Sequence, residues 1–260
     1  TDEGELDLKA MEALVTPRTR LIAVAFASNS LGTVNPISHI VALARSCGAK
    51  ILVDAAQAIA HIPIDVQALD IDFLCFSGHK MFGPFGVGVV YGKKALLEAM
   101  APYQGGGGMI KHVSCDSITY AGVPTRFEAG TPSIASVIGL GEAIRFINHV
   151  GSDTIYLREK KLTTRMIEGI KSVRGVRLFG QSPNGCPTNS FCMDHVHPHD
   201  LNSFLDMKGF ALRAGHHCNQ PLMDYFQVPA TNRFSLSYYN SLDEVDSFIE
   251  TLKEAQRFFA

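Results

Sequence analysis

The sequence predicts an α/β fold in which a mainly parallel sheet forms a large domain and a smaller α+β domain follows. Three observations predict it. Of the 260 residues, 46% are hydrophobic and 18% are charged, which is enough to bury a sizeable core and argues against disorder. Short apolar runs alternate with helical patterns through the first half of the chain. No internal repeat or low-complexity tract interrupts this alternation.

The first half contains the runs that predict the parallel sheet. Residues 21–27 are almost continuously apolar, as in a strand buried on both faces. A helical pattern follows Pro36 and stops at Gly48. The later strand-like runs are residues 50–54, 71–77 and 86–92, with a short helix at 93–100. In such sheets ligands gather outside the carboxyl ends of the strands, so a site is expected there.

The second half predicts a further set of helices and strands. Residues 102–125 are rich in glycine and lack a clear period, so we expect a loop. Two helices are expected at 133–149 and 152–171, which suggests domains 1–150 and 151–260. Beyond them we expect strands at 174–180, 189–193 and 209–215, a helix after His199 and an amphipathic final helix at 242–259.

Composition limits the class of protein. The net charge of −2 gives no electrostatic reason to expect a nucleic acid or an acidic membrane surface as a partner. No apolar run approaches the roughly 18 residues that a membrane-spanning helix needs. The first residues are acidic, unlike a signal peptide. The six cysteines form no CxxC pair, which favours free thiols in a reducing compartment and a cytoplasmic protein.

Lys80 and Asp54 each follow an apolar run. A lysine at the end of a buried strand loses hydration, which favours the neutral, nucleophilic amine needed to form a Schiff base with an aldehyde cofactor. A carboxylate at Asp54 suits the protonated ring nitrogen of pyridoxal 5′-phosphate (PLP). A solvated lysine in a turn and a helix N-cap are the plainer alternatives. Gln57, Ser77 and His79 add polar groups beside these two, which favours a ligand site over a core.

The segment RAGHHC forms a second cluster. It places Cys218 after Arg213, His216 and His217, and cationic or imidazole groups favour a reactive thiolate. An ordinary loop cysteine is the alternative. Arg233, fifteen residues further on, is suited to holding a carboxylate.

Other motifs argue against competing chemistries. The histidines of HVHPHD alternate, but no cysteine or acid nearby completes a metal-ligand spacing, so we expect no metal and a solvated loop before a helix. GGGGMI lacks the GK[ST] of a P-loop. SxxK, GxSxG and HExxH, which would indicate a hydrolase, do not occur.

Four segments together resemble the class V PLP-dependent enzymes: VDAAQ, SGHKMFGPFGVGVVYG, RFEAGTP and RAGHHC. Within that class the sequence is most similar to the group II (SufS-type) cysteine desulfurases, which include selenocysteine lyases. RAGHHC is the most discriminating of the four. The resemblance covers nearly the whole chain and implies the PLP-dependent transferase fold of type I.

The resemblance also implies roles for individual residues. Lys80 corresponds to the lysine that binds PLP covalently and Cys218 to the nucleophile. The implied cofactor-binding residues are Asp54 at the ring nitrogen, Gln57 at the phenolic oxygen, Ser77 and His79 at the phosphate, and Thr131 at the phosphate of a neighbouring subunit. The implied substrate-binding residues are Asn29, Arg213 and Arg233.

The reaction implied is the conversion of L-cysteine to L-alanine, with the sulfur carried as a persulfide on Cys218 and passed to an acceptor protein for iron–sulfur cluster assembly. A homodimer is implied by the role of Thr131. Selenocysteine or another amino acid as substrate, and an inactive dimerisation or binding module, remain alternatives. The family's first third is missing from the sequence, which begins without methionine, so we expect the sheet to lack strands and the cofactor pocket to lack a wall.

Overall fold

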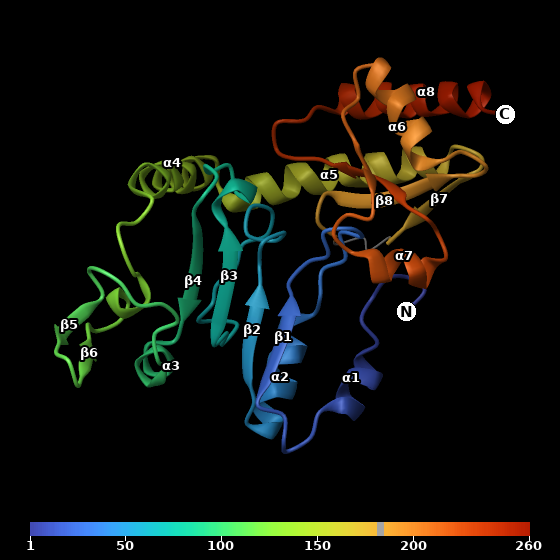
Figure 1. Cartoon of the computed structure of the whole chain (residues 1–260). Helices are drawn as coiled ribbons and strands as arrows, with labels where there is room; N and C mark the ends of the chain where they lie inside the picture. Colours follow the sequence, from blue (N-terminus) through green and yellow to red (C-terminus); the bar gives the residue numbers. More distant parts are fainter. Residues whose placement is uncertain (181–184) are drawn as a thin grey trace.

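A computed structural model describes residues 1–180 and 185–260 of the chain, and these residues form two four-stranded sheets and a separate two-stranded one (Figure 1). One four-stranded sheet has the order β1-β2-β3-β4 and the other has the order β7-β8-β10-β9. Helix α5 (Ser152–Lys171) runs from the first sheet to the second, and the C-terminal helix α8 (Leu242–Phe258) packs against it. Within the described ranges no helix is long and apolar enough to cross a membrane.

The first sheet confirms the predicted strands of the N-terminal half. Strands β1 (Leu21–Ala25), β2 (Lys50–Asp54) and β3 (Phe73–Ser77) are parallel. The predicted fourth strand exists as β4 (Gly88–Gly92) but runs antiparallel to β3. A parallel neighbour needs a crossover of a dozen or more residues, and the ten residues between β3 and β4 are too few.

The helices of this half lie around the sheet. They are α1 (Leu8–Leu14), which the sequence did not predict, α2 (Ile37–Cys47) and the short α3 (Lys94–Ala99). Helix α2 ends at Gly48 as predicted, because this glycine adopts the left-handed conformation with φ of 76°. Its buried residues pack with the β1–β2–β3 core, in which Ile51 and Val53 are fully buried.

The predicted loop at 102–125 contains a hairpin, so that prediction is wrong in part. Strands β5 (Ile110–Val113) and β6 (Ile118–Tyr120) pair antiparallel through a turn in which Ser114 N–H donates to Ser117 O at 2.9 Å. Both strands are too short for an alternation to be recognised among the flanking glycines. Every residue of the hairpin strands is exposed. A 3₁₀ turn (Thr125–Phe127) follows, and helix α4 (Ile134–Val150) begins where it was predicted.

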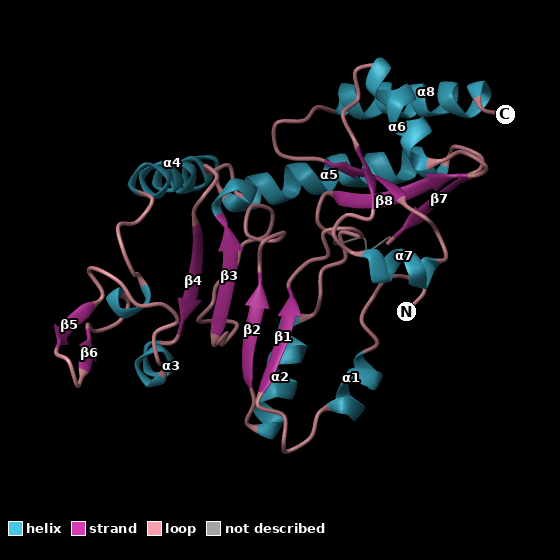
Figure 2. Ribbon diagram, viewed as in Figure 1, coloured by secondary structure: helices cyan, strands magenta, loops and turns pink. Residues whose placement is uncertain are grey.

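The second sheet is antiparallel and packs against helices (Figure 2). Its strands are β7 (Val176–Phe179), β8 (Thr188–Met193), β9 (Arg213–Gly215) and β10 (Thr231–Ser235). The predicted strand at 209–215 is limited to β9, and β10 was not predicted. Helix α6 (Pro198–Met207) follows the histidine-rich segment, and α7 (Gln220–Phe226) follows the cysteine loop. A core of α5, α6, α8 and this sheet includes Phe191 and Leu252. The division at residue 150 falls between α4 and α5 and stays a prediction.

Candidate functional site

Three predicted residues lie at the carboxyl ends of adjacent parallel strands. Asp54 is the last residue of β2 and pairs with Cys75 of β3, whose own last residue is Ser77. Asn29 lies in the loop that follows β1, and this loop is tied to β2 where Phe26 N–H donates to Asp54 O at 2.7 Å. The ends of three strands therefore bring a carboxylate, a hydroxyl and an amide to one edge of the sheet. The sequence predicted strand-end positions for Asp54 and Ser77, whereas Asn29 was implied by the resemblance alone.

Asp54 is exposed at this edge and also supports the local turn. One carboxylate oxygen accepts a hydrogen bond from Ala56 N–H at 2.8 Å. The alternative of a helix N-cap is wrong, because the residues after Asp54 form a turn and not a helix. The exposed carboxylate remains accessible to a ligand. Gln57 lies partly buried in the turn that follows.

Ser77, His79 and Lys80 form a second group, in and just before a 3₁₀ turn (Gly78–Lys80). Ser77 Oγ and His79 Nδ1 are 2.8 Å apart, and the His79 ring stacks on Phe85 with centroids 5.3 Å apart. Lys80 is exposed, so the expected loss of hydration is wrong. The 3₁₀ turn carries the lysine out of the sheet, so that it does not share the buried surroundings of β3. Its side-chain nitrogen is available to a ligand.

Thr131 is not brought to this edge in the described part of the chain. It is exposed in the segment between the turn at Thr125–Phe127 and α4. Its predicted role was toward a neighbouring subunit, and a single chain leaves that role a prediction.

Cys218 lies in a tight turn between β9 and α7. Asn219 N–H donates to His216 O at 2.9 Å, and the two central residues, His217 and Cys218, have φ of 55° and 60°. Positive φ at both central positions defines a type I′ turn, which non-glycine residues seldom form. Cys218 is exposed in an open hollow of about 530 Å³ lined by residues 213–221. Arg213 Nη2 donates to Cys218 Sγ at 3.8 Å.

Arg213 and Arg233 are directly opposite each other on β9 and β10. Arg233 Nη1 donates to Asn29 O at 3.0 Å, so β10 is joined to the loop after β1. Burial lowers the pKa of Arg233, and the charge of Arg213 lowers it further. Two guanidinium groups in register give this strand pair a positive charge suited to a carboxylate.

His217 is the residue whose importance the sequence did not single out. Its carbonyl accepts from Asn29 Nδ2 at 2.6 Å, so the cysteine turn is attached to the loop after β1. The residue is 1% exposed, and its Nε2 lies 3.1 Å from Thr231 O and 2.8 Å from Thr231 Oγ1. Burial, with the charge of Arg233, lowers the pKa of His217 to about 4. The pair of adjacent histidines before Cys218 was the available signal, but it did not show which ring is buried.

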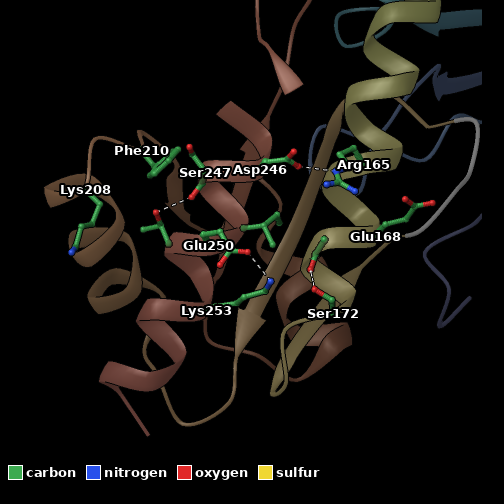
Figure 3. Close-up of a pocket in the computed structure, with 12 residues that line it drawn as sticks. Arg165, Glu168, Ser172, Lys208, Phe210, Asp246, Ser247, Glu250 and Lys253 are labelled. Atoms are coloured by element: carbon green, nitrogen blue, oxygen red, sulfur yellow. Dashed lines mark hydrogen bonds and ion pairs between the residues drawn. The ribbon is translucent and has the colours of Figure 1, made fainter. Parts of the chain in front are cut away.

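Another hollow, of about 940 Å³, lies between α5, α8 and the end of α6 (Figure 3). It contains none of the predicted site residues. Its charged groups neutralise one another, since Arg165 pairs with Asp246 at 2.7 Å and Lys253 with Glu250 at 2.8 Å. The hollow thus has no excess charge to select a charged ligand.

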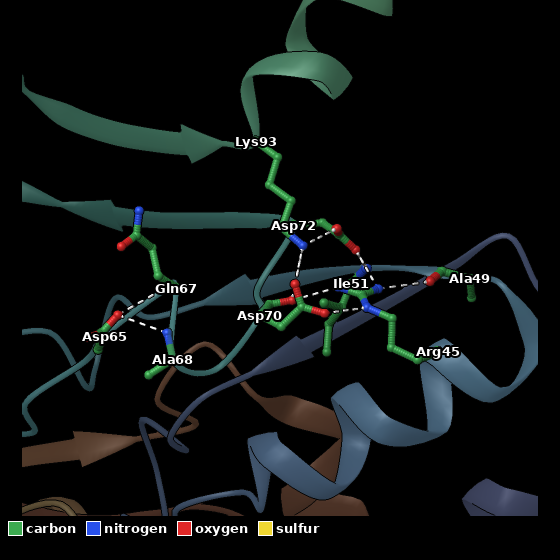
Figure 4. A network of polar contacts seen from close by, with 9 residues as sticks. All are labelled: Arg45, Ala49, Ile51, Asp65, Gln67, Ala68, Asp70, Asp72 and Lys93. Atoms are coloured by element: carbon green, nitrogen blue, oxygen red, sulfur yellow. Dashed lines mark hydrogen bonds and ion pairs between the residues drawn. The ribbon is translucent and has the colours of Figure 1, made fainter.

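A charged network at the opposite end of the first sheet is structural (Figure 4). Asp72, just before β3, accepts from Arg45 Nη1 at 2.8 Å and from Ile51 N–H at 2.9 Å. Lys93, after β4, pairs with both Asp70 and Asp72. The network joins α2 to the amino ends of β2 and β3, on the side away from Asp54 and Ser77.

The histidine-rich segment caps a helix. His197 is the N-cap of α6, with Nδ1 accepting from His199 N–H at 3.3 Å. Among the described residues, no group of three or more His, Cys, Asp or Glu side chains is arranged to hold a metal ion.

Comparison with known proteins places these features in one family. The family model for class-V aminotransferases matches residues 1–248. A cysteine desulfurase from Dickeya dadantii (strain 3937) is 47% identical over 258 residues, which are 99% of this chain and 62% of that protein.

Two solved structures share the fold. The cysteine desulfurase CsdA from Escherichia coli, in its S-sulfonic acid form, is 37% identical with a TM-score of 0.93, over 98% of this chain and 63% of that one. The apo cysteine desulfurase from Thermococcus onnurineus NA1 is 37% identical with a TM-score of 0.95, over 99% of this chain and 64% of that one. The chain therefore spans less than two thirds of the length of each of these relatives.

Proposed function

This chain belongs to the class-V aminotransferase family, and we propose that it carries the chemistry of a PLP-dependent cysteine desulfurase. One observation carries the proposal. The hydrogen bond from Asn29 Nδ2 to His217 O, 2.6 Å long, fastens the Cys218 turn to the loop after β1. The predicted nucleophile is thereby attached to the same sheet edge as the predicted cofactor-binding residues Asp54 and Ser77.

The residues at this edge fit PLP. Asp54 offers an exposed carboxylate for a protonated ring nitrogen, and Lys80 offers an exposed amine for the aldehyde. Ser77 and His79, held together by their 2.8 Å contact, offer donors for a phosphate, and Gln57 lies in the adjoining turn. When bound, PLP supplies an electron sink that stabilises negative charge at the substrate's Cα. We assign residues 1–150 to the cofactor-binding domain and 151–260 to the small domain.

The chain's own residues divide the remaining work. Asn29, Arg213 and Arg233 bind and orient the carboxylate of L-cysteine. Lys80 Nζ carries protons to and from the substrate carbons. Cys218 Sγ accepts the sulfur: the substrate C–S bond breaks, an S–S bond forms on Cys218, and L-cysteine and the thiol become L-alanine and a persulfide. We further propose that an acceptor protein removes this sulfur for iron–sulfur cluster assembly.

The cofactor is tested first. We expect the purified chain to turn yellow with PLP and to lose that absorbance with borohydride, while Lys80→Ala binds PLP without becoming reducible. Lys94→Ala, which changes an exposed lysine on α3, is the matched control. A chain that stays colourless with PLP would favour the alternative of an inactive dimerisation or binding module.

Sulfur transfer is tested next. Incubation with L-cysteine is expected to give L-alanine and a persulfide that mass spectrometry locates on Cys218. Cys218→Ala abolishes both, and Cys115→Ala, at an exposed cysteine between β5 and β6, leaves them unchanged. Desulfuration that persists in Cys218→Ala would exclude this residue as the nucleophile.

Finer assignments belong to the same proposal. RAGHHC supports the group II subclass, Thr131 supports a homodimer, and the free cysteines support a cytoplasmic location. Selenocysteine lyase is the alternative activity. Turnover of L-selenocysteine that is retained in Cys218→Ala, while L-cysteine turnover is lost, would favour that alternative.

A further inference from the structure

His217 is the most constrained residue of the cysteine turn. It immediately precedes Cys218, it is 1% exposed, and its Nε2 lies within hydrogen-bond distance of Thr231 at the start of β10. Cys218 beside it is exposed. Two neighbouring residues of one turn therefore have opposite surroundings, because His217 is buried and Cys218 is exposed to solvent.

The turn needs such a lock. His217 and Cys218 both adopt the left-handed conformation, which is disfavoured for residues other than glycine. Such a conformation persists only when the surrounding structure over-determines it. The turn's own hydrogen bond, from Asn219 N–H to His216 O, is a single contact.

His217 supplies two anchors that point to different elements. Its carbonyl accepts from Asn29 Nδ2 in the loop after β1, and its ring binds Thr231 at the start of β10. These anchors lie 188 and 14 residues away in sequence, so they fix the turn relative to both sheets.

The ring is unsuited to proton transfer. It is buried, its Nε2 is occupied by Thr231, and its Nδ1 has no hydrogen-bond partner in the described structure. The charged and titratable groups around it are Arg213, Arg233 and His216, and all of them disfavour a protonated ring. Because the ring is neutral and buried, its contribution is to fix the position of the turn.

We propose that His217 is a positioning residue that holds Cys218 Sγ in one place at the mouth of the site, through the carbonyl anchor to Asn29 and the ring anchor to Thr231. The inference rests on the proposed function for its purpose, since a fixed sulfur serves attack on a bound substrate. Its structural content, a turn locked by His217, stands without turnover.

Three variants separate the contributions. His217→Gln keeps an amide nitrogen with reach similar to Nε2, so the ring anchor is retained. His217→Asn tolerates the left-handed conformation but is too short to reach Thr231. Asn29→Ala removes the carbonyl anchor and leaves the ring in place.

The first measurement is hydrogen exchange at the Asn219 amide, which donates the turn's hydrogen bond. We expect exchange to be about tenfold faster in His217→Asn and Asn29→Ala, the effect of losing one hydrogen bond, and near wild type in His217→Gln. The second is the rate at which iodoacetamide alkylates Cys218, with exposed Cys115 as the reference within the same molecule. The Cys218 rate is expected to change in His217→Asn while the Cys115 rate stays constant.

Turnover supplies the third measurement. In the active holoenzyme, His217→Asn is expected to lower kcat for L-cysteine with little change in KM, and His217→Gln to restore it. Wild-type exchange and alkylation in both His217→Asn and Asn29→Ala would overturn the proposal. If His217→Asn does not fold, Asn29→Ala and His217→Gln decide it by the same readouts. A wild-type chain that shows the locked turn but forms no persulfide would overturn the proposed function alone.

Discussion

Asp72 is a single buried carboxylate that joins three elements. Its side chain is 3% exposed and contacts Arg45 at the end of α2, Ile51 of β2 and Lys93 after β4. Burial opposes its ionisation, yet the hydrogen bond from Arg45 and the one from Ile51 N–H hold its pKa below the ordinary value. Asp70 beside it is exposed, and hydrogen bonds from Arg45 and Lys93 lower its pKa to about 2.

Replacing Asp72 is therefore expected to destabilise the first sheet. Asp72→Asn keeps the shape of the side chain but removes the negative charge that pairs with Arg45 and Lys93. We therefore expect a loss of about 2–4 kcal/mol in the free energy of unfolding. Urea denaturation followed by circular dichroism measures it. Asp70→Asn, at the exposed partner, is the matched control and should cost less. Equal losses in the two variants would contradict the importance given to the buried site.

The buried ring of His217 predicts a pH dependence of stability. Its pKa is lowered in the folded chain to about 4 from an ordinary value of 6.5, so the unfolded chain binds protons first as the pH falls. The contribution of the neutral His217 ring to the free energy of unfolding is fully present above pH 6.5 and is lost as the pH falls toward 4. The loss amounts to up to about 3 kcal/mol, at 1.36 kcal/mol per pKa unit.

Unfolding free energies measured between pH 7 and pH 4 test this prediction. His217→Gln cannot titrate and is expected to flatten the profile in that window. The exposed His149 of α4 provides the control, since His149→Gln should leave the wild-type slope. A wild-type profile that is already flat would contradict a neutral buried ring.

Elements differed in how well the sequence predicted them. The strands β1, β2 and β3 were predicted because their runs are mainly apolar. The expectation that residues 21–27 are buried on both faces is wrong, because in β1 Ile22 is buried while Leu21 and Ala23 on the opposite face are exposed. The direction of β4 was missed because it depends on the length of a connection. The hairpin β5–β6 and strand β10 were missed because these strands are short and show no clear alternation of apolar and polar residues.

The candidate site was predicted in a similarly uneven way. Asp54 and Ser77 end apolar strands, and parallel pairing alone brings them together. The link between Asn29 and His217 spans 188 residues and joins two sheets, so no local pattern contains it. The exposure of Lys80 could not be predicted either, because it depends on the 3₁₀ turn that carries the lysine away from β3.

The loop after β1 depends on a glycine where it meets β8. Gly32 has φ of 68°, and a Cβ there would clash with Thr188 O and lie 2.7 Å from Cys186 O. Its own carbonyl accepts from Cys186 N–H at 2.8 Å. Backbone atoms on both sides leave no flexible group that could move aside.

Gly32→Ala is therefore expected to cost about 3 kcal/mol or more, from the left-handed conformation together with the clash. Asn29 lies in the same loop and binds the carbonyl of His217, next to Cys218. The rate at which iodoacetamide alkylates Cys218 in the absence of PLP should therefore change as well. Gly48→Ala, which has a similar φ of 76° but open space around its Cβ, is the control for the conformational part alone. If both variants lose the same stability, the close approach to β8 has no energetic effect.

At the scale of the whole molecule, Glu159 couples segments from both sheets. It lies on α5 and is 2% exposed. It contacts His61 Nδ1 at 2.8 Å and accepts from Tyr238 N–H at 2.9 Å and from Ser237 Oγ at 3.2 Å. His61 follows the turn that contains Gln57, and Tyr238 follows β10, so one carboxylate joins this turn to the segment that leaves the strand bearing Arg233.

Removing this carboxylate is expected to weaken the coupling as well as the stability. Glu159→Ala leaves His61, Ser237 Oγ and the Tyr238 N–H without their hydrogen-bond partner. Each buried polar group left unpaired costs about 1–3 kcal/mol, so we expect a loss of about 3–5 kcal/mol. We expect a single urea transition for the wild type. If residues 1–150 and 151–260 are separate domains, this transition should divide into two in Glu159→Ala, because the domains then unfold independently. Glu168→Ala, at an exposed glutamate of the same helix, should keep one transition with little loss. One undivided transition in Glu159→Ala, shifted by the full 3–5 kcal/mol, would contradict this expectation. The two sheets would then unfold as one cooperative unit, and Glu159 would stabilise that unit without being needed for its cooperativity.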